Sequence, residues 1–453
     1  MGDGGNSAAR RWVRRLVGLT VPTSARPTGR PCDSLVSVTA PTTPAPVPPP
    51  AGSSDGQRPV TLDWSSKGLW LPDTTTTGTE LGAAGHDLFD GPFTWPVMVA
   101  RLSAIEANVA QMARYCARHD VDFAPHGKTT MSPRLFAAQL AAGAWAITVA
   151  TANQALAAFR FGVPRVLIAN EVLDPRPLRW LARQGRDLLC YVDSLAGVSV
   201  LREALADGGK VRVLVELGYA GGRTGCRTVD EAEQVARAAA AVPGVEVAGV
   251  AGFEGMLPDA DQVEAFLTTI AQAAARIAPV CPYPVLLSAG GSTWFDVVVE
   301  VLGPVARAHG GRLVLRSGAV ITHDDGTYAA SGPFTRRPDE GSLTAALEVW
   351  AQVLSTPEPG LAILGAGKRD LPYDIGLPVP LSVRGLDGRQ RTLDGSTVER
   401  LNDQHAFLRG AAVVPGELVR LGISHPCTAF DKWRVIPVVD DAYRVVDVID
   451  TYF

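Results

Sequence analysis

Between residues 96 and 330 the sequence alternates regularly between strand-like and helix-like patterns. The segments between the strand-like runs carry helix signals. For example, Ser132 with Pro133 predicts a helix start, and Gly143 predicts its end. Eight strands separated by helices over roughly 200 residues are typical of a (β/α)8 barrel, whereas a doubly wound open sheet seldom needs eight regular repeats. The eight runs are Val121–Pro125, Trp145–Ala150, Val166–Ala169, Leu188–Val192, Val211–Leu217, Val245–Phe253, Pro284–Ser288 and Leu313–Arg316.

The rest of the chain divides into three further segments. Residues 1–60 are rich in Pro, Thr, Ser, Gly and Arg. We expect them to form a disordered extension, because such a composition buries too little apolar surface to offset the entropy of ordering. Residues 61–95 are expected to pack on the folded body. Residues 331–453 predict a mostly β domain, whose sheet we expect to include the short strand Trp95–Ala100. Its other expected strands are Leu377–Val383, Thr392–Val398, Leu418–Leu421, Trp433–Val439 and Tyr443–Val448.

The composition of the 453 residues argues against several classes of protein. Hydrophobic residues make up 46%, and the net charge of −4 argues against non-specific nucleic-acid binding. No apolar run reaches the roughly 18 residues that a membrane span needs, so no membrane contact is expected. The six cysteines lack CxxC spacing and do not form a recognisable disulfide framework, which predicts reduced thiols and a cytoplasmic location.

Two loops after predicted barrel strands suggest a cofactor site. The loop Pro125-His126-Gly127-Lys128-Thr129 follows the first strand, at the rim where barrel active sites are built. Burial would lower the pKa of Lys128 and make its amine a nucleophile, although a solvated loop lysine is the alternative. The loop Ser288-Ala289-Gly290-Gly291-Ser292-Thr293 follows the seventh strand. Its glycine amides, its hydroxyls and the helix N-terminus after it suit a phosphate, although an ordinary turn is the alternative.

Two arginines and a His-Cys pair are further candidates. Arg223 follows the fifth strand and Arg316 ends the eighth, so either can face a cofactor ring nitrogen or a substrate carboxylate, or form a rim salt bridge. His425 and Cys427 stand two residues apart in the predicted β domain. In an extended segment both would point the same way and could bind one zinc ion, with positions left open as in catalytic sites. A bare His-X-Cys also occurs by chance.

Together these segments resemble one family. The Pro-His-Gly-Lys-Thr segment, the Ala-Gly-Gly-Ser-Thr loop and the segment Ser-His-Pro-Cys-Thr-Ala-Phe-Asp-Lys-Trp are similar to the D-serine dehydratase and D-threonine aldolase group. These pyridoxal-phosphate enzymes share the fold of alanine racemase, known as fold type III. The resemblance covers roughly residues 61–453, and the His-Pro-Cys segment is its most specific part. It implies an α/β fold in which a (β/α)8 barrel is followed by a mostly β C-terminal domain.

The resemblance also implies roles in cofactor binding. Lys128 matches the lysine that holds pyridoxal phosphate, with His126 beside it. Arg316 stands where racemases of this fold place the arginine that faces the pyridine nitrogen, and Arg223 stands where aldolases have a cofactor-contacting arginine. The phosphate loop is matched by Gly290, Gly291, Ser292 and Thr293.

The implied reaction is the removal of water from a D-β-hydroxy amino acid such as D-serine, giving a 2-oxo acid and ammonia. His425 and Cys427 match the zinc pair of D-serine dehydratases. Aldolases of the group carry aspartate as the second ligand, so Cys427 favours a dehydratase. Lys128 is expected to act as the general base, and the enzyme is expected to be a homodimer with a small D-amino acid as its substrate.

Three alternatives stay open. A metal-dependent D-threonine aldolase would use the same ligands to split the Cα–Cβ bond. A racemase would leave the His-Pro-Cys segment without a purpose. A non-catalytic carrier would bind pyridoxal phosphate without turnover and without a metal.

The composition of residues 1–60 generates a prediction about truncation. Deleting them should leave the melting temperature and the activity nearly unchanged, because the segment offers no apolar core. Thermal unfolding and turnover of the full-length and shortened chains check this. A large loss of stability would show that the segment docks on the folded body.

Overall fold

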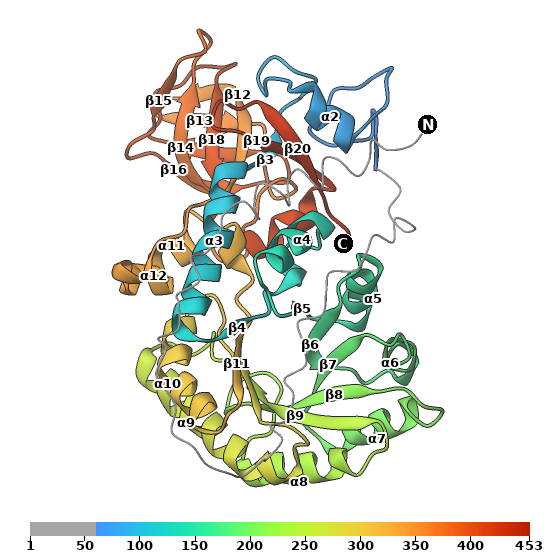
Figure 1. The fold of residues 1–453 in the computed structure, drawn as a ribbon. Helices are drawn as coiled ribbons and strands as arrows, with labels where there is room; N and C mark the ends of the chain where they lie inside the picture. Colours follow the sequence, from blue (N-terminus) through green and yellow to red (C-terminus); the bar gives the residue numbers. More distant parts are fainter. Residues whose placement is uncertain (1–59) are drawn as a thin grey trace, which may run out of the picture.

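The computed structural model describes residues 60–453, so the expected disordered extension lies outside the described residues. Two bodies make up the described chain (Figure 1). A parallel sheet with surrounding helices forms one, and an antiparallel β domain forms the other. The expected fold class is confirmed.

The parallel sheet contains eight strands in the order β4-β11-β10-β9-β8-β7-β6-β5. Backbone bonds join the two outermost positions: Trp145 N donates to Phe123 O at 2.7 Å, and Thr148 N donates to Pro125 O at 2.9 Å. These bonds close the sheet into a barrel. Its strands are β4 (Asp122–Phe123), β5 (Ile147–Val149), β6 (Arg165–Glu171), β7 (Asp187–Val192), β8 (Val211–Leu217), β9 (Val245–Gly252), β10 (Leu286–Ala289) and β11 (Arg312–Leu315).

Helices follow the barrel strands in turn, and their apolar faces are buried against the outside of the sheet. Small and branched side chains, such as Ala124, Leu167, Leu214 and Val314, fill the interior. A filled barrel leaves room for a site only at its rim. The helices are α3 (Leu102–His119), α4 (Pro133–Ala141), α5 (Ala152–Arg160), α6 (Pro175–Ala182), α7 (Leu195–Ala204), α8 (Val229–Ala240), α9 (Ala260–Ile277) and α10 (Phe295–Ala308).

A second sheet is mainly antiparallel and contains ten strands. The strand β3 precedes the barrel in sequence but belongs to this sheet, where it pairs with β12 and β19. In Figure 1, α3 runs from this sheet to the barrel. The strands are β3 (Val97–Arg101), β12 (Leu347–Glu358), β13 (Leu361–Leu364), β14 (Val379–Arg384), β15 (Gln390–Thr392), β16 (Thr397–Leu401), β17 (Ala406–Arg409), β18 (Leu418–Gly422), β19 (Val435–Val439) and β20 (Val445–Asp450).

One strand expected from the sequence is wrong. The run Thr392–Val398 contains the end of β15 and the start of β16, separated by a turn at Asp394-Gly395. Gly395 has a φ of 74°, a conformation that glycine adopts without strain and that interrupts a strand. The strands β12, β13 and β17 were not among the expected ones.

Short elements precede the two bodies in the chain and connect them. The N-terminal segment contains β1 (Thr61–Leu62), β2 (Thr76–Thr77) and α2 (Gly78–Ala84), and α2 packs against β20. The short helices α11 (Thr327–Ser331) and α12 (Pro333–Arg336) connect the barrel to β12. At the C-terminus, Tyr452 N donates to Met131 O at 3.1 Å, so the chain end contacts the loop after Lys128.

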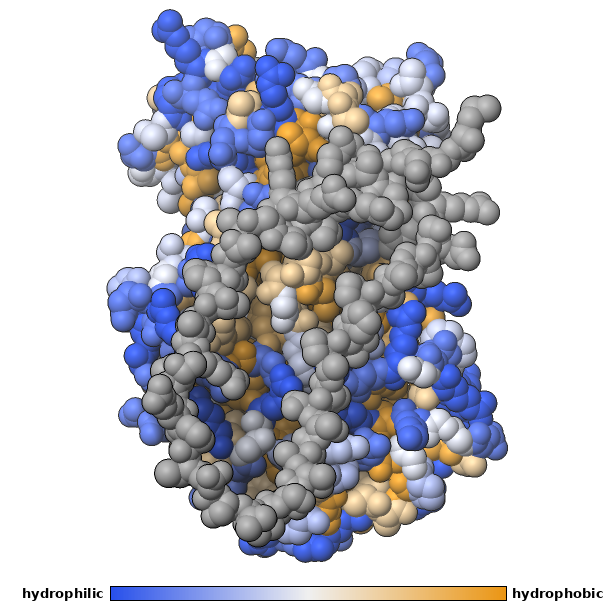
Figure 2. Space-filling view, viewed as in Figure 1, coloured by the Kyte–Doolittle hydropathy of each residue, from blue (hydrophilic) through white to orange (hydrophobic). Residues whose placement is uncertain are grey.

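On the face shown in Figure 2, hydrophobic residues gather between the β domain and the barrel, and hydrophilic residues cover the outer edges. Within residues 60–453, no helix is both long enough and apolar enough to cross a membrane.

Candidate active site

A cavity of about 200 Å³ lies at the carboxyl ends of the barrel strands. Five residues predicted from the sequence line it: His126, Lys128, Arg223, Gly291 and Arg316. Each comes from a loop or strand end at the same rim. The other lining residues are Ala150, Ala169, Asn170, Tyr191, Thr224 and Phe253.

Lys128 lies on a single 3-10 turn, η1 (Gly127–Thr129), directly after β4. A side chain at Gly127 would place its Cβ 2.5 Å from Cζ of Phe136, so only glycine allows this approach. Burial lowers the pKa of Lys128, and the nearby Arg223 and Arg316 lower it further, although Cys427 opposes them. A lysine with a lowered pKa supplies more neutral amine, which is the nucleophilic form.

His126 and Tyr191 present polar atoms without partners. The Nδ1 of His126 and the hydroxyl of Tyr191 are buried, and neither has a hydrogen-bond partner in the protein. Burial lowers the pKa of His126 well below its usual value, and three nearby cations add to this. The imidazole is therefore neutral at pH 7. Buried polar atoms are nearly always satisfied, so these two suit a bound polar molecule.

The two arginines differ in their surroundings. Arg316 is buried and donates to Oγ of Ser288 at 2.8 Å and to the carbonyl of Gly252 at 2.7 Å. Its guanidinium is therefore fixed in the floor of the cavity. Arg223 is exposed, and its guanidinium lies 4.1 Å from the Phe253 ring centroid. Of the two, Arg223 is the freer to move toward a ligand.

The glycine loop after β10 is held by a carboxylate. Glu254 is fully buried and accepts from Gly290 N at 3.3 Å and from Gly291 N at 2.6 Å. These two amides are therefore already satisfied within the protein. The hydroxyls of Ser292 and Thr293, just before α10, remain as candidate donors to an anion, but Gly290, Ser292 and Thr293 do not line the cavity at the barrel rim. Ser292 lines a neighbouring cavity of about 450 Å³ instead, and its Oγ accepts from Ala319 N at 3.2 Å.

Arg336 of α12 also contacts the loop after β10. It donates to the carbonyl of Thr293 and to Asp296 at 2.7 Å, and its guanidinium lies 4.4 Å from the Trp294 ring centroid. This arrangement joins the loop to the start of α10.

The His-Cys segment comes from the second sheet, between β18 and β19. His425 is extended, but Pro426–Thr428 form a 3-10 turn (η5), so the expectation of a fully extended pair is wrong. The two side chains nevertheless lie close enough for Cys427 to raise the pKa of His425. Thr129 donates to Sγ of Cys427 at 3.8 Å, which places the thiol next to the turn that carries Lys128.

Asp374 orients His425. Its Oδ2 lies 2.7 Å from Nδ1 of His425, and its Oδ1 accepts from Oγ1 of Thr428 at 2.8 Å. Burial lowers the pKa of His425, but the nearby Cys427 and the hydrogen bond with Asp374 outweigh it and raise the pKa to about 9. A histidine held through Nδ1 presents Nε2 to a metal, which is a common arrangement around zinc. No group of three or more His, Cys, Asp or Glu suited to a metal occurs in residues 60–453, so this pair would leave open positions.

Sequence reasoning missed Asp374, Glu254, Tyr328 and a pair of glutamates. The Tyr328 ring centroid lies 5.7 Å from that of His425, and Tyr328 lines a cavity together with Ser292. Tyr328 therefore lies between the glycine loop and His425 and Cys427, which we call the metal-type pair. None of these residues stands in a recognisable motif.

Glu171 ends β6, and Glu216 lies on β8. Leu214, two residues before Glu216 on β8, fills the barrel, and Glu171 pairs across a bulge with Tyr191, which also lies in the interior, so both carboxyls point inward. Burial raises the pKa of Glu171 to about 8, and the charge of the nearby Glu216 adds to this. The pair therefore holds a proton at neutral pH. The sequence signal that could have indicated this pair is a charged residue at a strand position that faces the barrel interior.

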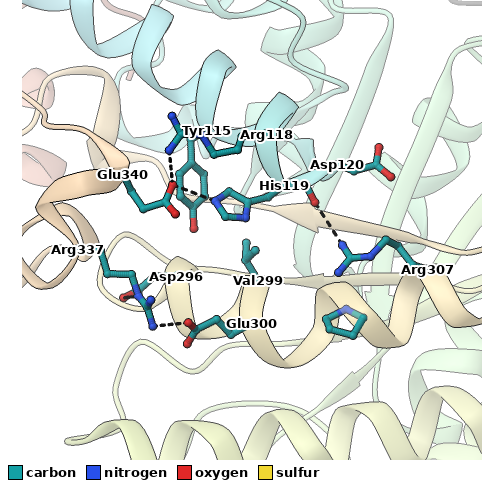
Figure 3. Close-up of a pocket in the computed structure, with 11 residues that line it drawn as sticks. Tyr115, Arg118, His119, Asp120, Asp296, Val299, Glu300, Arg307, Arg337 and Glu340 are labelled. Carbon is teal, nitrogen blue, oxygen red and sulfur yellow. Dashed lines mark hydrogen bonds and ion pairs between the residues drawn. The ribbon is translucent and has the colours of Figure 1, made fainter. Parts of the chain in front are cut away.

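A larger cavity of about 450 Å³ lies between α3, α10 and the chain before β12 (Figure 3). None of the predicted site residues lines it. Most of its charged groups are paired with one another: Glu340 contacts Arg118 at 2.8 Å and His119 at 3.1 Å, and Arg337 contacts Glu300. Because these charges are already compensated, the smaller cavity is the better candidate for chemistry.

Two family models match the chain. "Alanine racemase, N-terminal domain" matches residues 100–296, and "Putative serine dehydratase domain" matches residues 346–439. The first match contains Lys128, and the second contains His425 and Cys427.

Curated relatives are similar over most of the chain. A D-threonine aldolase from Arthrobacter sp. is 30% identical over 361 residues, which cover 76% of this chain and 89% of the relative. A 3-hydroxy-D-aspartate aldolase from Paracoccus denitrificans is 27% identical, covering 62% of this chain and 74% of the relative. A D-threo-3-hydroxyaspartate dehydratase from Delftia sp. is 34% identical, but over 29% of this chain and 35% of the relative.

Solved structures share the fold. The D-threonine aldolase of Filomicrobium marinum has a TM-score of 0.68 and 25% identity, covering 80% of this chain and 95% of that one. The Delftia dehydratase has a TM-score of 0.62 and 23% identity, covering 80% and 98%. Its solved variants replace a histidine and a cysteine that stand two positions apart, and the cysteine variant is described as metal-free.

The glutamate pair generates a prediction about the pH dependence of stability. The folded pKa of Glu171 is raised above its unfolded value, so the folded state holds this proton more tightly, and the free energy of unfolding should fall as pH rises from about 4.5 to about 8. Glutamine does not titrate. Glu171→Gln should therefore gain stability relative to the unchanged protein between pH 5 and pH 9, by about 1 kcal/mol or more.

Urea denaturation at both pH values checks this, with Glu264→Gln on the exposed face of α9 as the control. A constant difference between Glu171→Gln and the unchanged protein would contradict the raised pKa.

Proposed function

The chain belongs to the D-serine dehydratase and D-threonine aldolase group of alanine racemase-like enzymes, and we propose that it is a lyase dependent on pyridoxal phosphate and zinc. Its proposed reaction removes water from a D-β-hydroxy amino acid and gives a 2-oxo acid and ammonia. One observation carries the proposal. The turn with the partly buried Lys128 and the turn with Cys427 are in contact through Thr129, so a thiol–imidazole pair lies beside the cavity that Lys128 lines.

The lining of the cavity suits pyridoxal phosphate. Lys128 would hold the cofactor covalently, and the unpartnered Nδ1 of His126 and hydroxyl of Tyr191 would face its polar edge. The hydroxyls of Ser292 and Thr293, which follow the lining residue Gly291, would bind its phosphate. When bound, the cofactor supplies an electron sink for charge that develops at the substrate α-carbon. The Lys128 amine would accept the α-proton, because burial lowers its pKa and so enlarges the fraction in the neutral form.

The metal-type pair suits zinc. A thiolate and an imidazole are ligands that zinc prefers over magnesium or calcium. Nε2 of His425 and Sγ of Cys427 would hold the ion, and Asp374 would fix the tautomer of His425. Zinc would supply a Lewis acid for the β-oxygen of the substrate, which is a poor leaving group without assistance.

A D-threonine aldolase is the second candidate. The similarity to the Arthrobacter aldolase favours it, since that match spans 361 residues. Cys427 favours the dehydratase, because the resemblance pairs cysteine with dehydratases and aspartate with aldolases. The replaced histidine and cysteine of the Delftia dehydratase have the same spacing as His425 and Cys427, which supports the first candidate.

The first prediction concerns Lys128. Reduction with borohydride should fix pyridoxal phosphate on Lys128, and peptide mapping checks the position. Lys128→Ala should lower turnover by about 10³-fold or more, because it removes both the cofactor anchor and the proposed base. Lys210→Ala, an exposed lysine elsewhere on the barrel, is the control. A label on any other lysine would show that the assignment is wrong.

The second prediction concerns the metal and the reaction. The protein should contain about one zinc per chain, and a strong chelator should abolish activity without removing the cofactor absorbance. Cys427→Ala should remove both the zinc and the dehydration of D-serine, whereas Cys281→Ala, another partly buried thiol, should change neither.

Product analysis with D-serine, D-threonine and D-3-hydroxyaspartate then separates the candidates. 2-Oxo acid with ammonia indicates the dehydratase, and glycine with an aldehyde indicates the aldolase. Full dehydration by zinc-free protein would exclude the metal role.

A further inference from the structure

Lys67, in the N-terminal segment, lies outside both matched domains and contacts the two loops that flank the metal-type pair. The family models match residues 100–296 and 346–439, whereas Lys67 lies before both. Its Nζ forms an ion pair with Oδ1 of Asp370 at 2.7 Å and donates to the carbonyl of Arg369 at 2.8 Å. The same Nζ lies 3.9 Å from the Trp433 ring centroid and 3.4 Å from the Lys432 carbonyl. One ammonium therefore contacts two separate loops.

The first of these loops is built around a buried carboxylate. The side chain of Asp370 is 1% exposed. Its Oδ2 accepts from Gly367 N at 2.9 Å and from Nε2 of Gln404 at 2.8 Å, and Lys67 is the cation paired with its Oδ1. A buried carboxylate that loses its cation is strongly unfavourable, so the loop would have to rearrange without Lys67.

The second loop is tied to the first at the same point. Nε1 of Trp433 donates to the carbonyl of Asp370 at 2.9 Å. Gly68 has a φ of 82°, and a side chain there would place its Cβ 3.2 Å from Trp433, so the backbone beside Lys67 packs directly against the indole. Lys67, Asp370 and Trp433 thus form one contact, which we call the N-terminal clamp.

Each loop leaves the clamp toward the metal-type pair. Four residues after Asp370, Asp374 contacts Nδ1 of His425 at 2.7 Å. Trp433 ends the segment that contains His425 and Cys427, within which Thr428 donates to Asp374 at 2.8 Å. The clamp therefore sets the distance between the orienting carboxylate and the imidazole that it orients.

We propose that Lys67 is a positioning residue for the metal site, which it controls by holding the loop of Asp374 against the segment of His425 and Cys427. This inference rests on the proposed zinc role of that pair. Residues 60–95 are thereby part of the catalytic apparatus, although they contribute no group to the cavity.

Lys67→Met tests the clamp, because it keeps most of the apolar stem and removes the charge. We expect amide hydrogen exchange to rise at least tenfold in residues 367–376 and 425–433 and to stay unchanged in the barrel strands. Zinc affinity, measured by competition with a chelator, should fall at least tenfold, while the absorbance of bound pyridoxal phosphate should persist. Lys67→Arg should restore most of both properties, and Lys210→Met is the control at an exposed position.

The outcomes separate the clamp from the proposed function. Unchanged exchange in both loops of Lys67→Met would overturn the clamp, even if the unchanged protein binds zinc as proposed. Failure of the unchanged protein to bind zinc would overturn the proposed metal role, and the positioning role with it. Should Lys67→Met not fold, Lys67→Gln retains a donor for the Arg369 carbonyl and allows the same comparison.

Discussion

Closing eight parallel strands into a barrel places all their carboxyl ends at one rim, and the candidate site depends on this constraint. The bonds between β4 and β5 complete the closure, directly beneath the turn that carries Lys128. Loops that are distant in sequence, such as those of Arg223 and Gly291, then face the same cavity. The packed interior contributes the low polarity that lowers the pKa of Lys128.

The barrel rim supplies the candidate cofactor-binding residues, but it does not supply the metal-type pair. The second sheet delivers that pair on the connection between β18 and β19. Its position relative to Lys128 depends on side-chain contacts between the two bodies, including Thr129 with Cys427 and Tyr328 with His425. The amine and the thiol–imidazole pair of the proposed site thus come from two different domains.

The periodic features of the chain could be predicted from sequence, and the irregular ones could not. The barrel follows from repeated strand-helix alternation, and Lys128, Ser292 and Cys427 stand in segments with a recognisable pattern. The strand expected at Thr392–Val398 is wrong because a two-residue turn interrupts an otherwise strand-like run.

The residues that hold the site residues in place could not be predicted from sequence, for a different reason. Asp374, Glu254 and Lys67 carry no local pattern, and each acts on residues far away in the sequence. Such partners become apparent only when the chain is folded. Glu216 is intermediate, since its inward position follows from strand alternation but its neighbour Glu171 lies on another strand, after a bulge.

Glu254 has a consequence for the order of assembly. Its carboxylate satisfies the amides of Gly290 and Gly291, so that part of the loop after β10 has its shape set by the chain itself. A loop held in this way does not need an incoming anion to fold. Folding of this part of the loop therefore does not have to wait for the proposed cofactor to bind.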